Sequence, residues 1–216
     1  MNYNINRYIK KEILPHFKEH GFLVHRSILF KAPIRDILAG FCFDRSDDAM
    51  YLVVFFQPLF IGIDYISYLF GGRVKNANRS EIKFKLDDAH IDSSTQEIIA
   101  HIKANIDLVL GLENTISFYR FFSERQKKDP HYLFRMAATS CYLSEPDCDE
   151  LLQDAIDYIE NSTDKRPWEF ELLKTAKVLQ DSSRTSAIDR IKLLQTWRMY
   201  TIEKLGFSKF SSGNAV

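Results

Sequence analysis

The sequence predicts an α+β fold, with an N-terminal helix on a mainly antiparallel sheet of about four strands and an all-helical region after it. Apolar residues alternate with a period near two through much of the first 90 residues, and recur every three to four residues from 91 onward. Apolar residues make up 45% of the 216 residues, which is typical of a chain with a packed core. We expect a sheet region over 1–90, a helical region over 91–207 and a frayed tail over 208–216.

The first expected element is a helix at residues 3–20. Apolar residues recur every four positions from Ile5 to Phe17, so they share one helix face. Pro15 lies late in this pattern and is expected to kink the helix or start a new turn. Gly21 is a suitable terminator.

Strands are expected next, because alternating or continuous apolar runs follow the helix. The connections between the first three runs are only a few residues long, which favours antiparallel pairing, since a parallel crossover needs a dozen residues or more. Gly71-Gly72, before the last run, predicts a turn. The expected strands cover residues 22–31, 36–44, 50–57 and 81–86.

Five or six helices are expected after residue 90. The cluster at residues 92–95 offers several N-cap side chains, and Glu97 can complete a capping box from Ser94. Pro130 and Pro167 suit the first position of later helices. No Gly/Pro/Ser-rich linker separates the sheet region from the helices, so we expect one integrated unit. The helical patterns reach from the 92–95 cluster to Gly111, and then cover about 113–127, 130–143, 147–161, 167–179 and 185–205.

Charge and hydropathy argue against two classes of partner. Lys and Arg number 29, as do Asp and Glu, so the formal net charge is zero. Nucleic-acid and anionic-membrane binders usually carry a basic excess, so neither partner is expected, although a local basic patch is compatible with this balance. The longest apolar stretch, Met50 to Ile63, is interrupted and shorter than the roughly 20 residues that a membrane span needs.

The three cysteines predict reduced thiols. Cys42 lies in an apolar run and is expected to be buried. Cys141 and Cys148 flank a turn and could form a disulfide only in an oxidising compartment. The first residues lack the basic and apolar regions of a secretory signal, so we expect a cytoplasmic protein.

Two short patterns are compatible with metal chemistry. His16 to His20 spells H-x-x-E-H, but Gly21 ends the helix at once, so a solvated helix end is the preferred interpretation. Asp64, Glu81 and Lys83 resemble the D…E-x-K arrangement of metal-dependent nucleases, in which carboxylates hold Mg²⁺ and the lysine positions water. Strand alternation also explains Glu81 and Lys83 as solvent-facing residues.

An aromatic stretch between Phe55 and Phe70 is too long and too interrupted to be one strand. Most of these rings are expected in the core. Some are expected to face a partner, since aromatic and arginine side chains dominate binding hot spots. The candidate partner-binding residues are Tyr65, Tyr68, Phe70 and Arg73.

The order of a helix, Gly21-Phe22, an alternating strand, Gln57-Pro58-Leu59-Phe60 and Gly71-Gly72-Arg73 resembles uncharacterised bacterial α+β proteins. The resemblance covers about residues 5–75. Some members of that group are similar to immunity proteins encoded beside toxins. The resemblance implies a non-enzymatic protein that binds a protein partner, such as a toxin, and it brings no catalytic residues and no cofactor.

Three classes of function therefore stay open. The preferred one is a non-enzymatic protein-binding protein of the toxin-immunity type. The second is a metal-dependent nuclease that uses Asp64, Glu81 and Lys83. The third is an oligomer subunit or scaffold, although the sequence indicates no oligomeric state.

Overall fold

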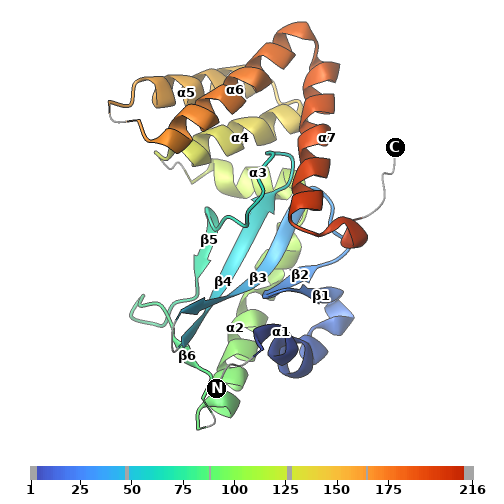
Figure 1. Cartoon of the computed structure of the whole chain (residues 1–216), viewed down its shortest axis with the longest axis vertical. Helices are drawn as coiled ribbons and strands as arrows, with labels where there is room; N and C mark the ends of the chain where they lie inside the picture. Colours follow the sequence, from blue (N-terminus) through green and yellow to red (C-terminus); the bar gives the residue numbers. More distant parts are fainter. Residues whose placement is uncertain (1–3, 47–48, 88, 126–127, 164, 212–216) are drawn as a thin grey trace. The chain divides into compact units, whose positions relative to one another are not determined.

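The structure is a computed structural model that describes residues 4–46, 49–87, 89–125, 128–163 and 165–211. The chain forms two compact units (Figure 1). We call them the sheet unit and the helical unit. The sheet unit comprises residues 1–57, 66–113 and 207–216, and the helical unit comprises 58–65 and 114–206.

The sheet unit confirms the α+β class and has more strands than the four expected. The strand order is β1-β2-β3-β4-β5, and β6 also pairs with β4. The pairs β1–β2, β2–β3, β4–β5 and β4–β6 are antiparallel. The strands are β1 (Phe22–His25), β2 (Ile28–Lys31), β3 (Ile37–Ser46), β4 (Ala49–Pro58), β5 (Phe70–Arg73) and β6 (Phe84–Lys85).

The single strand expected at residues 22–31 is a hairpin. β1 and β2 pair from Phe22 with Lys31 to His25 with Ile28. Arg26 takes a positive φ of 53°, which reverses the chain between the two strands. The apolar residues Phe22, Val24, Ile28 and Phe30 all fall on even-numbered positions across the reversal, so periodicity alone could not reveal it.

Gly71-Gly72 belongs to strand β5 and does not form the expected turn. A Cβ atom on Gly71 would lie 2.1 Å from the carbonyl oxygen of Val54 on β4. The two backbones therefore approach more closely than any residue with a side chain permits. Gly71, which indicated a turn in the sequence, therefore allows β5 to pair closely with β4.

The N-terminal helix is shorter and less regular than expected. One α-helical turn, α1 (Ile5–Tyr8), continues as a π-helical segment, η1 (Ile9–Ile13). Two 3₁₀ segments follow, η2 (Leu14–His16) and η3 (Lys18–His20), and Gly21 ends them in a left-handed conformation. Pro15 lies in η2, in agreement with the expected change of helix geometry at that residue.

Helix α2 (Ile91–Gly111) belongs to the sheet unit, although the sequence placed it with the later helices. It lies against the sheet (Figure 1) and contacts β3, β6 and η1. Its buried side chains include Ile98, Ile102 and Val109. The change of hydrophobic period at residue 91 therefore marks a change of secondary structure, and the compact unit continues to Glu113.

Part of the tail that was expected to be frayed is packed. Phe207 is buried, and its ring meets those of Phe30 and His25 edge-on at 5.1 and 5.0 Å. The Ile34 N–H donates to the carbonyl of Phe210, the last residue of the 3₁₀ turn η4 (Ser208–Phe210). Residues 212–216, the rest of the expected tail, lie outside the described residues.

The helical unit is built around α4, which contacts α3, α5, α6 and α7. Asn114 and Asp129 cap the N-termini of α3 and α4 by accepting backbone N–H bonds. The segment 58–65 joins this unit through Phe60, whose ring stacks on that of Tyr142 at 4.2 Å. The helices are α3 (Thr115–Ser123), α4 (Pro130–Leu143), α5 (Cys148–Glu160), α6 (Pro167–Thr185) and α7 (Ala187–Lys204).

Among the described residues, no helix combines the length and the apolar character that crossing a membrane requires.

Candidate functional site

Arg73, at the end of β5, forms the centre of an ion-pair cluster on the sheet. Its Nη2 lies 2.7 Å from Oδ2 of Asp44, near the end of β3. Its Nη1 lies 2.8 Å from Oε2 of Glu81, in the segment that bridges back to Lys75. All three side chains are partly exposed, so the cluster is open to solvent.

The guanidinium of Arg73 also lies over an aromatic ring. Its central carbon is 3.9 Å from the centre of the Tyr51 ring on β4. The hydrogen bonds from Arg73 to Glu81 and Asp44 raise the pKa of the guanidinium. Two carboxylates at its edge and a ring below its plane fix the orientation of Arg73.

Tyr68 lies on the same face of the sheet as Arg73. Its hydroxyl is 3.0 Å from Sγ of Cys42, and its ring meets that of Phe55 edge-on at 6.2 Å. Cys42 and Asp44 are two residues apart on β3, so both point to one face. Burial raises the pKa of Tyr68, as does its bond to Cys42. The tyrosine therefore presents a neutral hydroxyl at neutral pH.

We call this group the arginine–tyrosine surface. It consists of Asp44, Tyr51, Tyr68, Arg73 and Glu81.

The structure brings together two of the four predicted partner-binding residues, Tyr68 and Arg73. Phe70 is completely buried, because it pairs with Phe56 in the core of the sheet, so it is excluded from the surface. Tyr65 is exposed, but it belongs to the helical unit and is not placed relative to the other three.

The residues of the nuclease hypothesis are divided between the units. Asp64 belongs to the helical unit, and Glu81 and Lys83 belong to the sheet unit. The carboxylate of Glu81 is held by Arg73. Within the described ranges, no group of three or more His, Cys, Asp or Glu side chains is arranged to hold a metal ion. No observation favours this hypothesis over protein binding.

The H-x-x-E-H pattern does not form one helix face. His16 ends η2 and His20 ends η3, with Phe17 between the two 3₁₀ turns. An α-helix would align residues four apart, but these short 3₁₀ turns do not continue one α-helical face. A solvated helix end is the preferred interpretation, and the exposed His16 and His20 are consistent with it.

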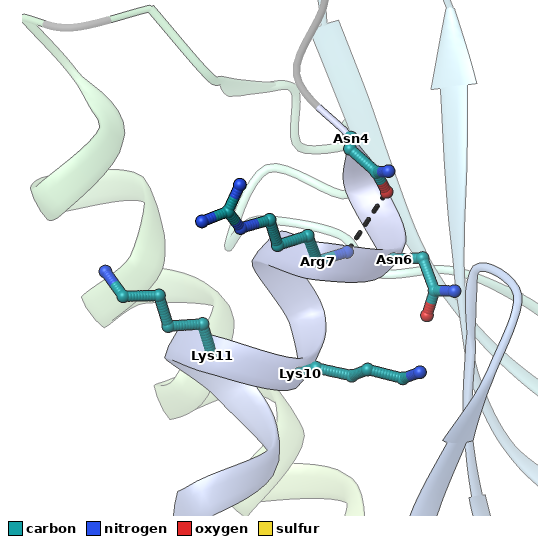
Figure 2. A pocket seen from close by; sticks show the side chains of 5 residues that line it. All are labelled: Asn4, Asn6, Arg7, Lys10 and Lys11. Carbon is teal, nitrogen blue, oxygen red and sulfur yellow. Dashed lines mark hydrogen bonds between the residues drawn. The ribbon is translucent and has the colours of Figure 1, made fainter.

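A second polar feature lies at the N-terminal helix. A pocket of about 390 Å³ lies there, and the Arg7 N–H donates a hydrogen bond of 3.1 Å to Oδ1 of Asn4. Figure 2 shows the side chains that line this pocket. Arg7 and Lys11 project to one side of the helix, and Lys10 and Asn6 project to the other (Figure 2). The residues that line it are Asn4, Asn6, Arg7, Lys10 and Lys11.

A larger groove of about 1050 Å³ continues from this pocket along α2. Arg7, Lys11 and Lys103 line it, but so do the acidic Glu12 and Asp92. Lys11 is already paired with Glu12 at 2.7 Å. The mixed charge favours neither an anion nor a cation, so we prefer the arginine–tyrosine surface as the functional site.

The sequence did not identify the role of Asp44 and Tyr51 beside Arg73. Asp44 adjoins a charged hairpin loop, which explained its charge, and Tyr51 lies in a continuous apolar run. Their relation to Arg73 depends on the pairing of β4 with β5 and on the order of the strands. A charged residue near the end of a buried strand, such as Asp44, was the only signal available from the sequence.

Comparison with protein-family models, with curated proteins and with solved structures finds no match to this chain.

Proposed function

We propose that this chain is a non-enzymatic protein-binding protein, and that its arginine–tyrosine surface contacts the partner. The observation that carries the proposal is the fixed orientation of Arg73, which is held by Asp44, Glu81 and the Tyr51 ring. A side chain that is ordered before binding loses less conformational entropy when the partner arrives. Arginine and tyrosine are also the residue types that most often dominate the energy of an interface.

The chemistry of the surface indicates what the partner offers. A guanidinium carries five N–H donors, and the bonds to Asp44 and Glu81 use Nη1 and Nη2. The donors left over suit backbone carbonyls or a carboxylate of the partner. Tyr68, which is 38% exposed, adds a hydroxyl and an apolar ring beside them.

The biological role that we propose is that of a toxin-immunity protein, which blocks a toxin by binding it. Its support is the sequence resemblance over about residues 5–75, a range that contains both Tyr68 and Arg73. A blocking protein needs a stable surface and no reaction centre, and a preorganised Arg73 suits that requirement.

Affinity capture from the native cell tests the proposal. Wild-type protein is compared with Arg73→Met and Tyr68→Ala, and with two controls of the same residue types, Arg120→Met on α3 and Tyr200→Ala on α7. Arg120 and Tyr200 are exposed and lie in the helical unit. Thermal melts establish that all five proteins are folded.

We expect the wild type and both controls to enrich the same partner, and the two surface variants to lose it. Enrichment of no protein above an untagged sample would contradict protein binding. Equal enrichment by all five proteins would contradict the assignment to this surface.

A further inference from the structure

Arg190 of helix α7 joins two buried cysteines in the helical unit. Its Nη1 lies 2.6 Å from Sγ of Cys148, at the start of α5, and 3.5 Å from Sγ of Cys141, near the end of α4. The same nitrogen lies 3.0 Å from Oδ1 of Asp149. Both cysteines are free thiols.

The turn between α4 and α5 places the two sulfurs side by side. Ser144 takes a left-handed conformation that ends α4, and the Glu145 N–H donates to the carbonyl of Ser140. Sγ of Cys141 lies 3.7 Å from the carbonyl oxygen of Cys148, and both sulfurs contact one nitrogen of Arg190. A disulfide between them therefore needs only a local movement of the side chains and the turn.

The third cysteine offers a comparison within the same chain. Cys42 and Cys148 are almost equally buried, at 5% and 6% exposure. Cys42 contacts the Tyr68 hydroxyl and lies near Asp44, and burial raises the pKa of its thiol. Cys148 contacts a guanidinium. The positive charge of Arg190 therefore lies beside the sulfur of Cys148, and the nucleophilic form of cysteine is the thiolate.

We propose that Cys148 and Cys141 are a redox-active pair, in which a hydroperoxide oxidises Cys148 and Cys141 resolves the product to a disulfide. Burial raises the pKa of Cys141 to about 12, so this residue stays a thiol until it reacts. This modification site is independent of the proposed binding function, because all of its residues lie in the helical unit.

The oxidation of the pair proceeds in two steps. The Cys148 thiolate attacks one oxygen of hydrogen peroxide, the O–O bond breaks, and the hydroxide that leaves takes up a proton to become water. Cys148 is then a sulfenic acid. The Cys141 sulfur attacks the Cys148 sulfur, the S–O bond breaks, and the hydroxyl leaves as water with the Cys141 proton. Two electrons pass from the two thiols to one peroxide, and a thiol reductant reverses the change.

The experiment uses the fully reduced wild-type protein, treated with hydrogen peroxide, alkylated and analysed by mass spectrometry at each cysteine. We expect a Cys141–Cys148 disulfide, lighter than the dithiol by two hydrogens, while Cys42 is still alkylated. Equal oxidation of Cys42, or persistence of both other thiols under the same treatment, would overturn the proposal. Because the wild type alone gives this result, the test does not depend on a variant that folds.

Variants then assign the roles. Cys141→Ser should leave a sulfenic acid on Cys148 that dimedone traps, and Cys148→Ser should leave Cys141 reduced. Arg190→Met should slow the oxidation of Cys148 at least about tenfold, and Arg190→Lys, which keeps the charge, should slow it less. Dimedone labelling of Cys141 in place of Cys148 would overturn the assigned order, and an unchanged rate in folded Arg190→Met would overturn the role of the arginine.

Discussion

The guanidinium carbon of Arg73 lies 3.9 Å from the centre of the Tyr51 ring. The ring supports one face of the guanidinium, while Asp44 and Glu81 accept bonds from its two terminal nitrogens. Strand β3, strand β4 and the segment that carries Glu81 thus each contribute one contact to the side chain of Arg73. The arrangement explains how a long, flexible residue comes to present a fixed surface to a partner.

The free energy of unfolding should depend little on Arg73. Partly exposed ion pairs contribute roughly 0–1 kcal/mol, and an exposed cation–π contact contributes about 0.5–1 kcal/mol. Arg73→Met removes two ion pairs and one cation–π contact together, so we expect it to lower the free energy of unfolding by about 0.5–2 kcal/mol, measured by urea denaturation. A loss of several kcal/mol would show that Arg73 is mainly structural, and would weaken its proposed role in binding.

Alanine at each of the two adjacent glycines of β5 should have different effects on the free energy of unfolding. A Cβ on Gly71 would lie 2.1 Å from the Val54 oxygen and 2.9 Å from Cα of Phe55, so Gly71→Ala should destabilise the protein by about 2 kcal/mol or more. A Cβ on Gly72 meets no atom within 4 Å, so Gly72→Ala should be neutral or stabilising by up to about 1 kcal/mol. Denaturant unfolding of both variants measures the difference. Similar losses would contradict the close backbone approach at Gly71.

The packed start of the C-terminal tail should contribute substantially to stability. Phe207 is buried against Phe30 and His25, so Phe207→Ala should cost about 3–4 kcal/mol. Phe170→Ala on α6 is the matched control, because Phe170 is 56% exposed and should change stability by about 0.5 kcal/mol or less. Chemical denaturation distinguishes the two. Equal effects would mean that the tail does not pack as described.

Acidification should destabilise the helical unit through His131. Burial lowers the pKa of His131, and Arg135 lowers it further, while Asp129 and Glu169 oppose the shift. Because the folded pKa lies below the unfolded value near 6.5, the unfolded chain binds more protons in this window. The stabilisation that depends on neutral His131 is therefore fully present above about pH 6.5. It is lost as the pH falls through the pKa of His131 in the folded protein.

Thermal melts between pH 7.5 and pH 5 test this dependence. His131→Phe keeps an aromatic ring next to Trp168, on which the imidazole stacks at 4.5 Å, but cannot titrate. His131→Gln is a second variant that does not titrate. Between pH 7.5 and pH 5, the melting temperature of each variant should fall less than that of the wild type. If the melting temperatures of both variants fall as much as that of the wild type, His131 does not cause the pH dependence.

Much of the fold could be predicted because local patterns determine it. Pro130 begins α4 and Pro167 begins α6, as their positions in the sequence indicated. Strands β3 and β4 lie within two residues of their expected ends, since continuous apolar runs bounded by polar residues mark them clearly. The switch to helical periodicity after residue 90 likewise marked the start of α2. The expected N-cap cluster at 92–95 was wrong, because the helix begins at Ile91, with His90 as its N-cap, and no side chain caps it.

The remaining features depend on contacts between distant residues. The pairing of Gly71 with Phe55 converts a turn signal into a strand, and the packing of Phe207 orders part of a polar tail. The candidate site has the same origin. Tyr68 and Arg73 were predicted from their residue types, whereas the ion pair of Arg73 with Asp44 became visible only when the strand order was known.

Isothermal titration of the captured partner, once purified, tests the central claim most directly. Hot-spot residues cost at least about 2 kcal/mol when truncated, so Arg73→Met and Tyr68→Ala should each weaken the affinity about 30-fold or more. Arg120→Met should bind within about threefold of the wild type, since surface substitutions away from the interface have small effects. Wild-type affinity in both folded surface variants would contradict the account.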